Sequence, residues 1–190
     1  LMTGVHIKLF EGHEDEINSV VAQSYSSMSS LVPISMDNDE EDRDNAPGGD
    51  SKGSVIIVSG CRDLTIRVWD YKSGYLLFEL LGHTSCVFEV ALCRTVNGAG
   101  LMGGVAPKKQ VAAGTPIIVS CSDDATIKFW NLENGKLIKS VKWHNVSVRG
   151  IDVVVLKPTN AIESVNDVFV IVSCGWDKTI QFHRGGCSLS

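Results

Sequence analysis

Serine, histidine and aspartate recur together three times along this chain of 190 residues. In each copy an aspartate follows a serine by four residues, and a histidine lies upstream of both. The three sets are His13, Ser59 and Asp63; His83, Ser120 and Asp124; and His144, Ser173 and Asp177. Such residues can form a hydrolase triad, in which histidine takes the proton of a serine nucleophile and aspartate orients the histidine.

Two features argue against a triad. A single active site does not require three copies of the same set. Each serine also lies within an apolar run that is typical of a strand, and none occupies the exposed G-x-S-x-G turn of a hydrolase nucleophile. The pattern therefore predicts a repeated structural network, and we expect no catalytic residues.

The remaining motifs for small-molecule chemistry are weak. Gly98, Gly100 and Gly103 match the G-x-G-x-x-G loop of dinucleotide-binding proteins, but Pro107 and Pro116 prevent the helix that must receive the pyrophosphate. The six cysteines form no C-x-x-C motif, and no spacing of cysteine and histidine suits zinc. We therefore expect no cofactor and no metal.

Three cysteines fall in or just after expected strands, namely Cys61, Cys121 and Cys174. Free cysteine is among the most buried residue types. We expect these three to be buried structural thiols.

Charge is concentrated in one segment of the chain. Residues 37–50 carry seven acids and one base, so this segment accounts for −6 of a formal net charge of −5 and leaves about +1 for the rest. The segment is expected to be solvated or to bind a partner. Without a basic stripe the sequence predicts no nucleic-acid partner, and without an apolar run near ~20 residues it predicts no membrane span.

Short runs rich in β-branched residues surround each copy of the set, and turn residues separate them. Strands are expected at residues 5–10, 17–22, 55–59, 65–69, 75–81, 87–93, 117–120, 126–130, 136–142, 148–156, 168–173 and 179–182. Asn134 and Gly135 form a strong hairpin signal, and Gly74 occupies the corresponding turn in the first copy. The sequence therefore predicts an all-β fold built from three similar units.

Two further positions complete the repeat. The residue six positions after each aspartate is Trp69, Trp130 or His183, and glycine precedes the first two histidines, where Trp143 precedes the third. The pattern resembles the WD40 family, whose repeat begins with Gly-His and ends with Trp-Asp. The resemblance implies a β-propeller whose blades are four-stranded antiparallel sheets.

The resemblance divides the chain into three blades. Blade one is expected at about 13–81 with a disordered acidic insertion at 24–53, blade two at about 83–142 with an insertion at 94–115, and blade three at about 144–190, incomplete. A closed ring needs ~4–8 blades. Because the chain begins with Leu1 and its last blade is unfinished, we expect a partial propeller. Its missing blades come from a longer chain or from self-association.

The resemblance also assigns roles to residues. In the family the histidine, serine, aspartate and tryptophan of a blade form one hydrogen-bonded network. The implied networks are His13, Ser59, Asp63 and Trp69; His83, Ser120, Asp124 and Trp130; and His144, Ser173, Asp177 and His183. Because an imidazole buries less apolar area than an indole, we expect blade three to be the loosest.

Family members bind partners on their narrow face, at positions three and five residues after the histidine and one before the aspartate. Carried onto this chain, these positions are Glu16, Asn18, Arg62, Cys86, Phe88, Asp123, Ser147, Arg149 and Trp176. Trp176 and Arg149 are the strongest candidates, because exposed tryptophan and arginine anchor many interfaces. Both Trp176 and Phe88 have an alternative role in packing.

Three functions remain open. The first is a non-catalytic intracellular scaffold, cytoplasmic or nuclear, that binds protein or peptide partners. The second is an accessory repeat domain of a larger enzyme. The third is a substrate-receptor adaptor of a cullin-type ubiquitin ligase, because Trp69, Asp70 and Lys72 resemble the W-D-x-R/K box of such receptors.

Overall fold

The computed structural model describes residues 6–25, 54–94, 116–156 and 168–185, which form three antiparallel sheets and no helix. Accordingly, none of these residues belongs to a helix long and apolar enough to cross a membrane. The strands are β1 (Ile17–Tyr25), β2 (Ser54–Cys61), β3 (Ile66–Asp70), β4 (Leu76–Leu80), β5 (Val87–Arg94), β6 (Pro116–Ser122), β7 (Ile127–Asn131), β8 (Leu137–Val141), β9 (Val148–Leu156), β10 (Val168–Gly175) and β11 (Ile180–Gly185).

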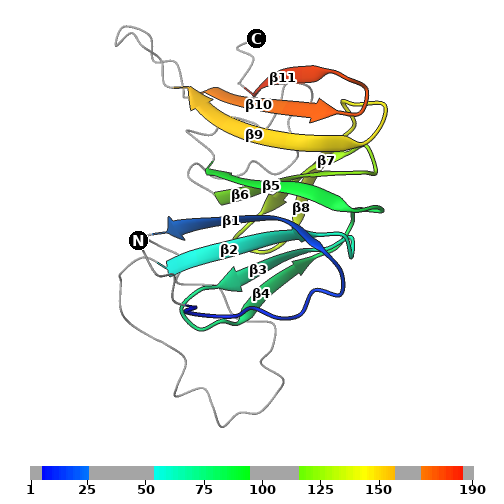
Figure 1. Ribbon diagram of the computed structural model, residues 1–190. Coiled ribbons are helices and arrows are strands. Elements are labelled where there is room, and N and C mark those ends of the chain that lie inside the picture. Colours follow the sequence, from blue (N-terminus) through cyan, green and yellow to red (C-terminus); the bar gives the residue numbers. More distant parts are fainter. Residues whose placement is uncertain (1–5, 26–53, 95–115, 157–167, 186–190) are drawn as a thin grey trace, which may run out of the picture.

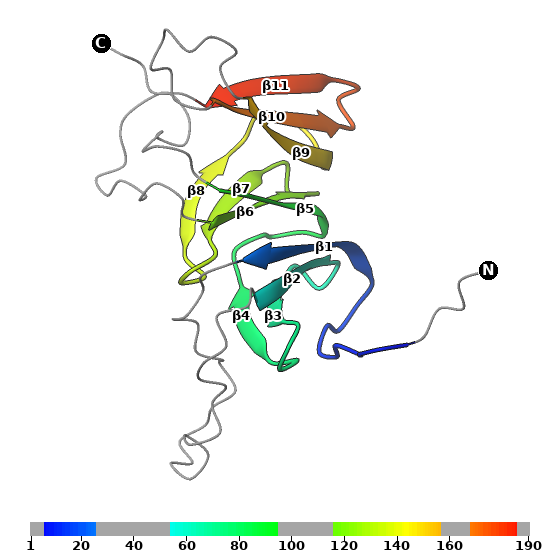
Figure 2. The ribbon, with the colours of Figure 1, turned by 90° about the vertical axis from the view of Figure 1, so that its left-hand side faces the viewer.

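The sheets are the blades that the repeat predicts. Strands β1–β4 form blade one, β5–β8 form blade two and β9–β11 form blade three, and each strand pairs with its neighbour in the chain. Figure 1 shows the three blades stacked face to face, with blade two in the middle. The view from the side shows the same order, in an open stack that closes no ring (Figure 2).

The turn between the second and third strands repeats in every blade. Leu64, Ala125 and Lys178, each directly after the network aspartate, have φ values of 71°, 64° and 65°. Non-glycine residues rarely adopt this left-handed conformation, which costs roughly 1–2 kcal/mol. The hydrogen bonds of the neighbouring aspartate hold the turn in place, and the turn brings the second and third strands into register.

The apolar core lies between the blades. The seam between blades one and two buries Ile56, Val58, Ile66, Val68, Leu77, Leu80, Val87, Val90, Ile118, Trp130 and Leu132. The seam between blades two and three buries Cys93, Ile117, Val119, Cys121, Ile127, Phe129, Val148, Ile151 and Ile171. The backbones of neighbouring blades come closest where the first strand of one blade, β5 or β9, lies beside the first and second strands of the blade before it.

The two outer flanks of the stack expose the residues that the seams bury. Ile66 and Ile127 are 0% exposed, but their counterpart Ile180 in blade three is 67% exposed. Phe182 is 71% exposed at the position that Phe129 occupies in blade two. In the described part of the chain, no further blade covers this flank.

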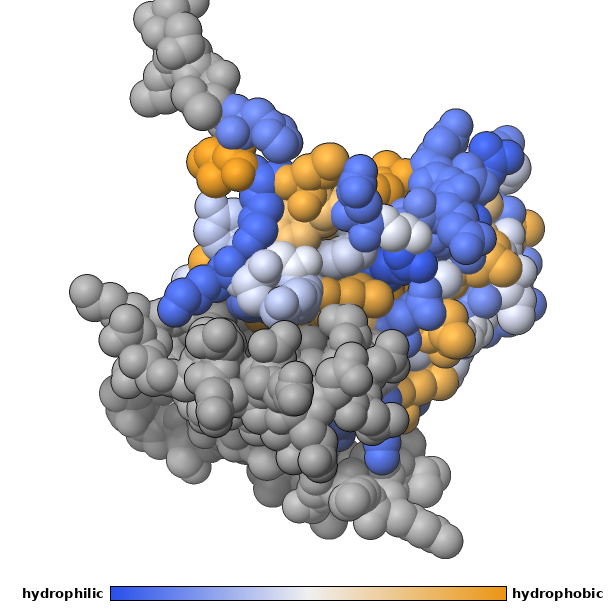
Figure 3. Space-filling view, turned by 90° about the horizontal axis from the view of Figure 1, so that it is seen from below, coloured by the Kyte–Doolittle hydropathy of each residue, from blue (hydrophilic) through white to orange (hydrophobic). Residues whose placement is uncertain are grey.

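Blade one shows the same effect on its own outer flank. Ile17 and Val20 are 54% and 66% exposed, whereas their counterparts in blade two, Val87 and Val90, are 0% and 4% exposed. Seen from below the view of Figure 1, hydrophobic residues reach the surface beside hydrophilic ones (Figure 3). The open flanks follow from the incomplete ring that the sequence predicts.

Two sequence expectations are wrong. Residues 6–10 form no strand; Phe10 instead packs edge-on against Trp69, with ring centroids 5.9 Å apart. Cys174 is exposed, unlike Cys61 and Cys121, because it lies on the uncovered flank of blade three.

The expected insertions are described only at their edges. Strand β1 continues to Tyr25 and β5 to Arg94, so the first residues of the predicted insertions at 24–53 and 94–115 belong to strands. The acidic run at 37–50 and the glycine motif around Gly100 lie outside the described residues.

Candidate functional site

Blade two contains the predicted network as a chain of hydrogen bonds. The Nδ1 atom of His83 lies 2.8 Å from Asp124 Oδ2, and its Nε2 atom lies 2.8 Å from Ser120 Oγ. The indole N–H of Trp130 donates to the same Ser120 Oγ at 2.9 Å. A neutral imidazole with its proton on Nδ1 satisfies every bond, because it donates to the carboxylate and accepts from the hydroxyl.

Blade one repeats this geometry. His13 lies 2.7 Å from both Asp63 Oδ2 and Ser59 Oγ, and the Trp69 indole donates to Ser59 at 3.0 Å. The network therefore ties the loop before the first strand to the second and third strands of the same blade.

Blade three keeps only part of the network. His144 lies 2.7 Å from Asp177 Oδ2 and 2.8 Å from Ser173 Oγ. His183 has the same register as the tryptophans, opposite Ile171. However, its Nε2 atom lies 3.1 Å from Gln181 Oε1, so the expectation that His183 joins the network is wrong. An imidazole is too short to reach the serine as the indole does.

Trp143 supplies the missing aromatic ring in blade three. Its ring stacks on His183, with centroids 3.5 Å apart and an interplanar angle of 10°. It also packs edge-on against Phe129 in the seam, with centroids 6.3 Å apart. The indole of Trp143, in the loop before His144, therefore offsets the apolar area that the third strand loses with histidine in place of tryptophan. Sequence reasoning missed this exchange, although its signal is the absence of the glycine in the third copy.

A threonine in each copy also escaped sequence reasoning. Thr65, Thr126 and Thr179 follow the network aspartate by two residues, and their hydroxyls donate to its Oδ1 atom at 2.7, 2.6 and 2.7 Å. Their regular spacing was the available signal. These bonds close the turn that contains the left-handed residue.

The aspartates are held in their ionised form. Burial raises the pKa of the Asp124 carboxyl. Hydrogen bonds from the His83 ring and the Thr126 hydroxyl lower this pKa by more than burial raises it. The pKa of Asp124 consequently lies well below its usual range. The same balance lowers the pKa of Asp63. Each carboxylate can therefore accept several hydrogen bonds at neutral pH.

The three serines are unsuited to nucleophilic attack. Ser59, Ser120 and Ser173 are 4%, 0% and 1% exposed. In blades one and two an indole N–H also occupies the hydroxyl oxygen. The hydroxyls are therefore buried groups whose hydrogen bonds join the loop before the first strand to the second strand of the same blade.

His13, Cys61 and Asp63 are grouped closely enough to hold a metal ion. Their polar atoms already serve the turn, because Cys61 Sγ donates to the Asp15 carbonyl and accepts from the Asp63 amide, both at 3.3 Å. In blade two, Ser122 makes the corresponding bonds without any sulfur ligand. The group is explained by the turn.

The predicted contact positions of blade one are engaged within the molecule. Arg62 lies 3.5 Å from Glu16 Oε2 and 3.8 Å from Asp15 Oδ2. The Asn18 amide donates to the Val87 carbonyl at 2.9 Å, so Asn18 links blade one to blade two. Arg62 and Glu16 remain exposed on the surface.

The contact positions of blades two and three converge. Phe88 lies in β5, Arg149 in β9, and Trp176 directly before the network aspartate of blade three. The Arg149 guanidinium carbon lies 3.8 Å from the Phe88 ring centroid and 4.1 Å from the Trp176 ring centroid. Trp176 is 66% exposed. Asp123, another predicted contact position, is also exposed and accepts a hydrogen bond from the Ser85 hydroxyl. We call Phe88, Arg149 and Trp176 the rim stack.

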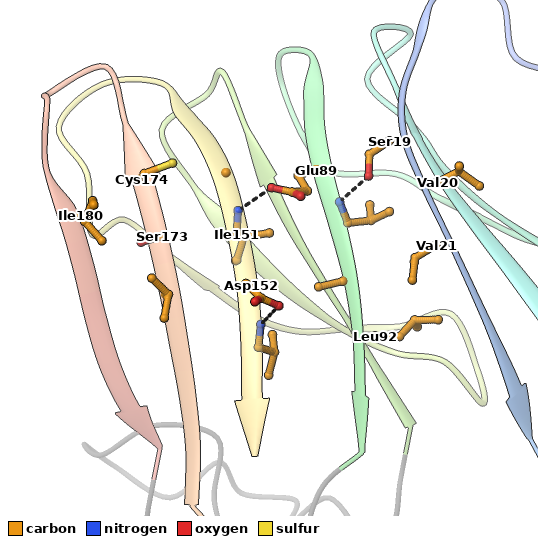
Figure 4. A pocket seen from close by; sticks show the side chains of 15 residues that line it. Ser19, Val20, Val21, Glu89, Leu92, Ile151, Asp152, Ser173, Cys174 and Ile180 are labelled. Carbon is orange, nitrogen blue, oxygen red and sulfur yellow. Dashed lines mark hydrogen bonds between the residues drawn. The ribbon is translucent and has the colours of Figure 1, made fainter. Parts of the chain in front are cut away.

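The first strands of the three blades also line an open groove of about 650 Å³. Figure 4 shows two hydrogen bonds between neighbouring blades in this groove. The Val90 amide donates to Ser19 Oγ at 3.3 Å, and the Ile151 amide donates to Glu89 Oε2 at 2.7 Å. These bonds hold adjacent blades together.

Lys72, the residue on which the adaptor hypothesis depends, is exposed in the turn between β3 and β4. Its carbonyl accepts a hydrogen bond from Lys8 Nζ at 2.7 Å. The hypothesis that this turn binds a ligase stays a prediction.

Comparison with known proteins agrees with this architecture. The family described as WD domain, G-beta repeat, matches residues 45–70 and 74–131. A nuclear distribution protein PAC1 from Arthroderma otae is 31% identical over 66% of this chain and 23% of its own length. Nuclear distribution protein nudF 1 from Talaromyces marneffei is 33% identical over 50% of this chain and 17% of its own length.

A solved structure, the WD40 β-propeller domain of Doa1, matches 67% of this chain and 32% of that chain with a TM-score of 0.41 and 23% identity. The repeated sheets and networks define a propeller built of repeats. The chain carries WD40 repeats, and its sheets have the architecture of β-propeller blades. It spans less than a quarter of the length of the two relatives above.

Proposed function

We propose that this chain is a non-catalytic, intracellular scaffold that binds protein or peptide partners through the end of the blades that carries the rim stack. The proposal places the chain in the cytoplasm or nucleus and assigns it no cofactor and no metal. In this proposal the blades provide a rigid support, and specificity lies in the loops at their ends.

The rim stack is the observation that carries the proposal. Trp176 exposes 66% of its surface, although a large aromatic ring gains free energy from burial. The ring lies over the Arg149 guanidinium, so its position is fixed before any partner arrives. A rigid aromatic ring beside an arginine is the composition of an interface hot spot.

The buried serines support a non-catalytic role. Each Ser-His-Asp set is used by the turn of its own blade, and Ser120 is fully buried. Removing Ser120 Oγ should therefore lower stability and leave the contact surface unchanged.

Affinity capture with the full chain tests the proposal. Wild type, Trp176→Ala and the control variant Tyr75→Ala would be immobilised, and bound proteins would be quantified by mass spectrometry. Tyr75 is a matched control, because it is an aromatic residue that is 50% exposed. It lies in blade one between β3 and β4, at the end of the blades opposite to the turn that carries Trp176. We expect Trp176→Ala to weaken capture of specific partners by roughly 30-fold or more, and Tyr75→Ala to leave it unchanged.

Thermal melting separates binding from folding in this experiment. Trp176→Ala should melt close to wild type because the ring is mostly exposed, whereas Trp69→Ala should melt well below it because Trp69 is 5% exposed. The proposal is refuted if Trp176→Ala captures the same proteins as wild type at the same affinity. It is also refuted if Trp176→Ala unfolds as readily as Trp69→Ala.

A further inference from the structure

Arg149 is held between two aromatic rings from different blades. Its guanidinium carbon lies over both rings, 3.8 Å from the Phe88 centroid and 4.1 Å from the Trp176 centroid. Two ring contacts of this kind restrict the orientation of the guanidinium group. Arginine stacked in this way keeps its N–H donors in the plane, where a ligand can approach only from the edge.

This arginine lacks an acceptor inside the described part of the molecule. Its Nε atom is buried without a hydrogen-bond partner there, and so is the hydroxyl of the nearby Ser147. Two acids of blade two accept hydrogen bonds from other groups, Asp123 from the Ser85 hydroxyl and Glu89 from the Ile151 amide. A buried donor without an acceptor costs about 1–3 kcal/mol.

Two other described arginines, Arg67 and Arg62, provide a contrast. Arg67 donates from Nε and Nη2 to Glu79 Oε1 at 3.2 and 2.9 Å, and Arg62 lies beside two acids. Neither of them stacks between two rings. Among these three arginines, Arg149 therefore combines a fixed orientation with an unpaired charge.

We propose that Arg149 binds an anionic side chain of the partner, a carboxylate or a phosphorylated residue, while Trp176 packs against the neighbouring part of that peptide. The proposal rests on the proposed function and adds the chemical class of the partner. Two oxygens of a carboxylate, or two oxygens of a phosphate, can accept hydrogen bonds from two in-plane donors of a guanidinium, which forms a bidentate pair. Clamping the arginine beforehand reduces the entropy lost on binding.

NMR of the arginine side chains in the full chain tests this directly. The probes are three N-acetylated, C-amidated tripeptides, Gly-Glu-Gly, Gly-phosphoserine-Gly and Gly-Gln-Gly. Because the Nε atom of Arg149 is buried, its proton should exchange slowly enough to give a cross-peak, and Arg149→Lys identifies that peak by its loss. The Nε cross-peak of Arg67 serves as an internal control.

We expect the glutamate and phosphoserine peptides to shift the Arg149 peak saturably, with dissociation constants on the order of 10 mM. The glutamine peptide and the Arg67 peak should show no shift. Trp176→Ala should weaken the anionic peptides by about two- to fivefold, because one face of the clamp is lost. A tenfold difference between the two anionic peptides would identify which group the partner supplies.

The result that overturns the inference is an Arg149 peak that no anionic peptide shifts up to about 50 mM, or that the glutamine peptide shifts equally. This outcome is distinct from failure of the proposed function. If capture depends on Trp176 but no anion reaches Arg149, the scaffold function remains and the anionic class is wrong. If anions bind Arg149 but capture does not depend on Trp176, the anion site remains and the proposed scaffold function is wrong.

Discussion

The exchange of aromatic residues in blade three leads to a double-mutant prediction. In blade two Gly82 lies against the Trp130 ring: an added Cβ would already be in contact with its Cη2 atom, at 3.4 Å, so a side chain as large as an indole would compete with the ring for space. In blade three the two positions hold Trp143 and His183, whose rings stack 3.5 Å apart. We expect Trp143→Gly and His183→Trp each to destabilise the chain, and the two together to restore the arrangement of blade two.

The magnitudes follow from the packing. Trp143→Gly removes a half-buried ring that also contacts Phe129, at about 2 kcal/mol, roughly half the cost of deleting a fully buried tryptophan. His183→Trp overpacks a site that the Trp143 ring already fills, again at about 2 kcal/mol. If the two effects were independent, the double variant would lose about 4 kcal/mol. We expect it to lose about 2 kcal/mol or less, because the introduced indole can donate to Ser173 Oγ.

Urea denaturation followed by circular dichroism would measure wild type and the three variants, with stability compared at equal m-values. A coupling energy of about 2 kcal/mol in the stabilising direction is expected. Ser173→Ala should then cost more in the double variant than in wild type, since only the former has an indole to bond. Additive effects within about 0.5 kcal/mol would refute the idea that Trp143 and His183 together replace the Gly-Trp pair.

Three further predictions concern acid, thiols and the open flanks. The folded-state pKa of Asp124 lies below the ordinary value of 3.8, so its contribution is complete above that pH and is lost as the pH falls below it. Asp124→Asn should therefore lower stability at pH 7 by about 1–3 kcal/mol and flatten the pH dependence of urea midpoints below pH 4, whereas an unchanged slope would refute the assignment. Native maleimide labelling followed by peptide mapping should modify the exposed Cys174 well before the buried Cys121, whose pKa burial raises; equal rates would contradict these exposures. Sedimentation should reveal concentration-dependent self-association that Phe182→Glu or Val20→Glu reduces, because both side chains lie on uncovered flanks; a wild-type monomer at all concentrations would count against it.

Much of the fold was predictable because the repeat is local. The spacing from Ser120 to Asp124 and Trp130 lies within one hairpin, where strand alternation and turn geometry determine which side chains meet. The histidine lies in the loop before the first strand of the same blade, and this loop brings it within hydrogen-bond distance of the serine. The network could therefore be inferred from the chain, whereas His183 could not, because its stacking partner replaces a glycine.

Residue types and spacing determined the three repeated all-β units, and the WD40 resemblance that rests on them implied the blades and the residues that tie each turn to its strands, since these features depend on short stretches of chain. Only the tertiary structure decided what depends on neighbouring blades. Cys174 and Phe182 are exposed because no blade covers them, although their counterparts in blade two are buried. The clamp on Arg149 likewise requires Phe88 from another blade, and distance along the chain gives no measure of such a contact.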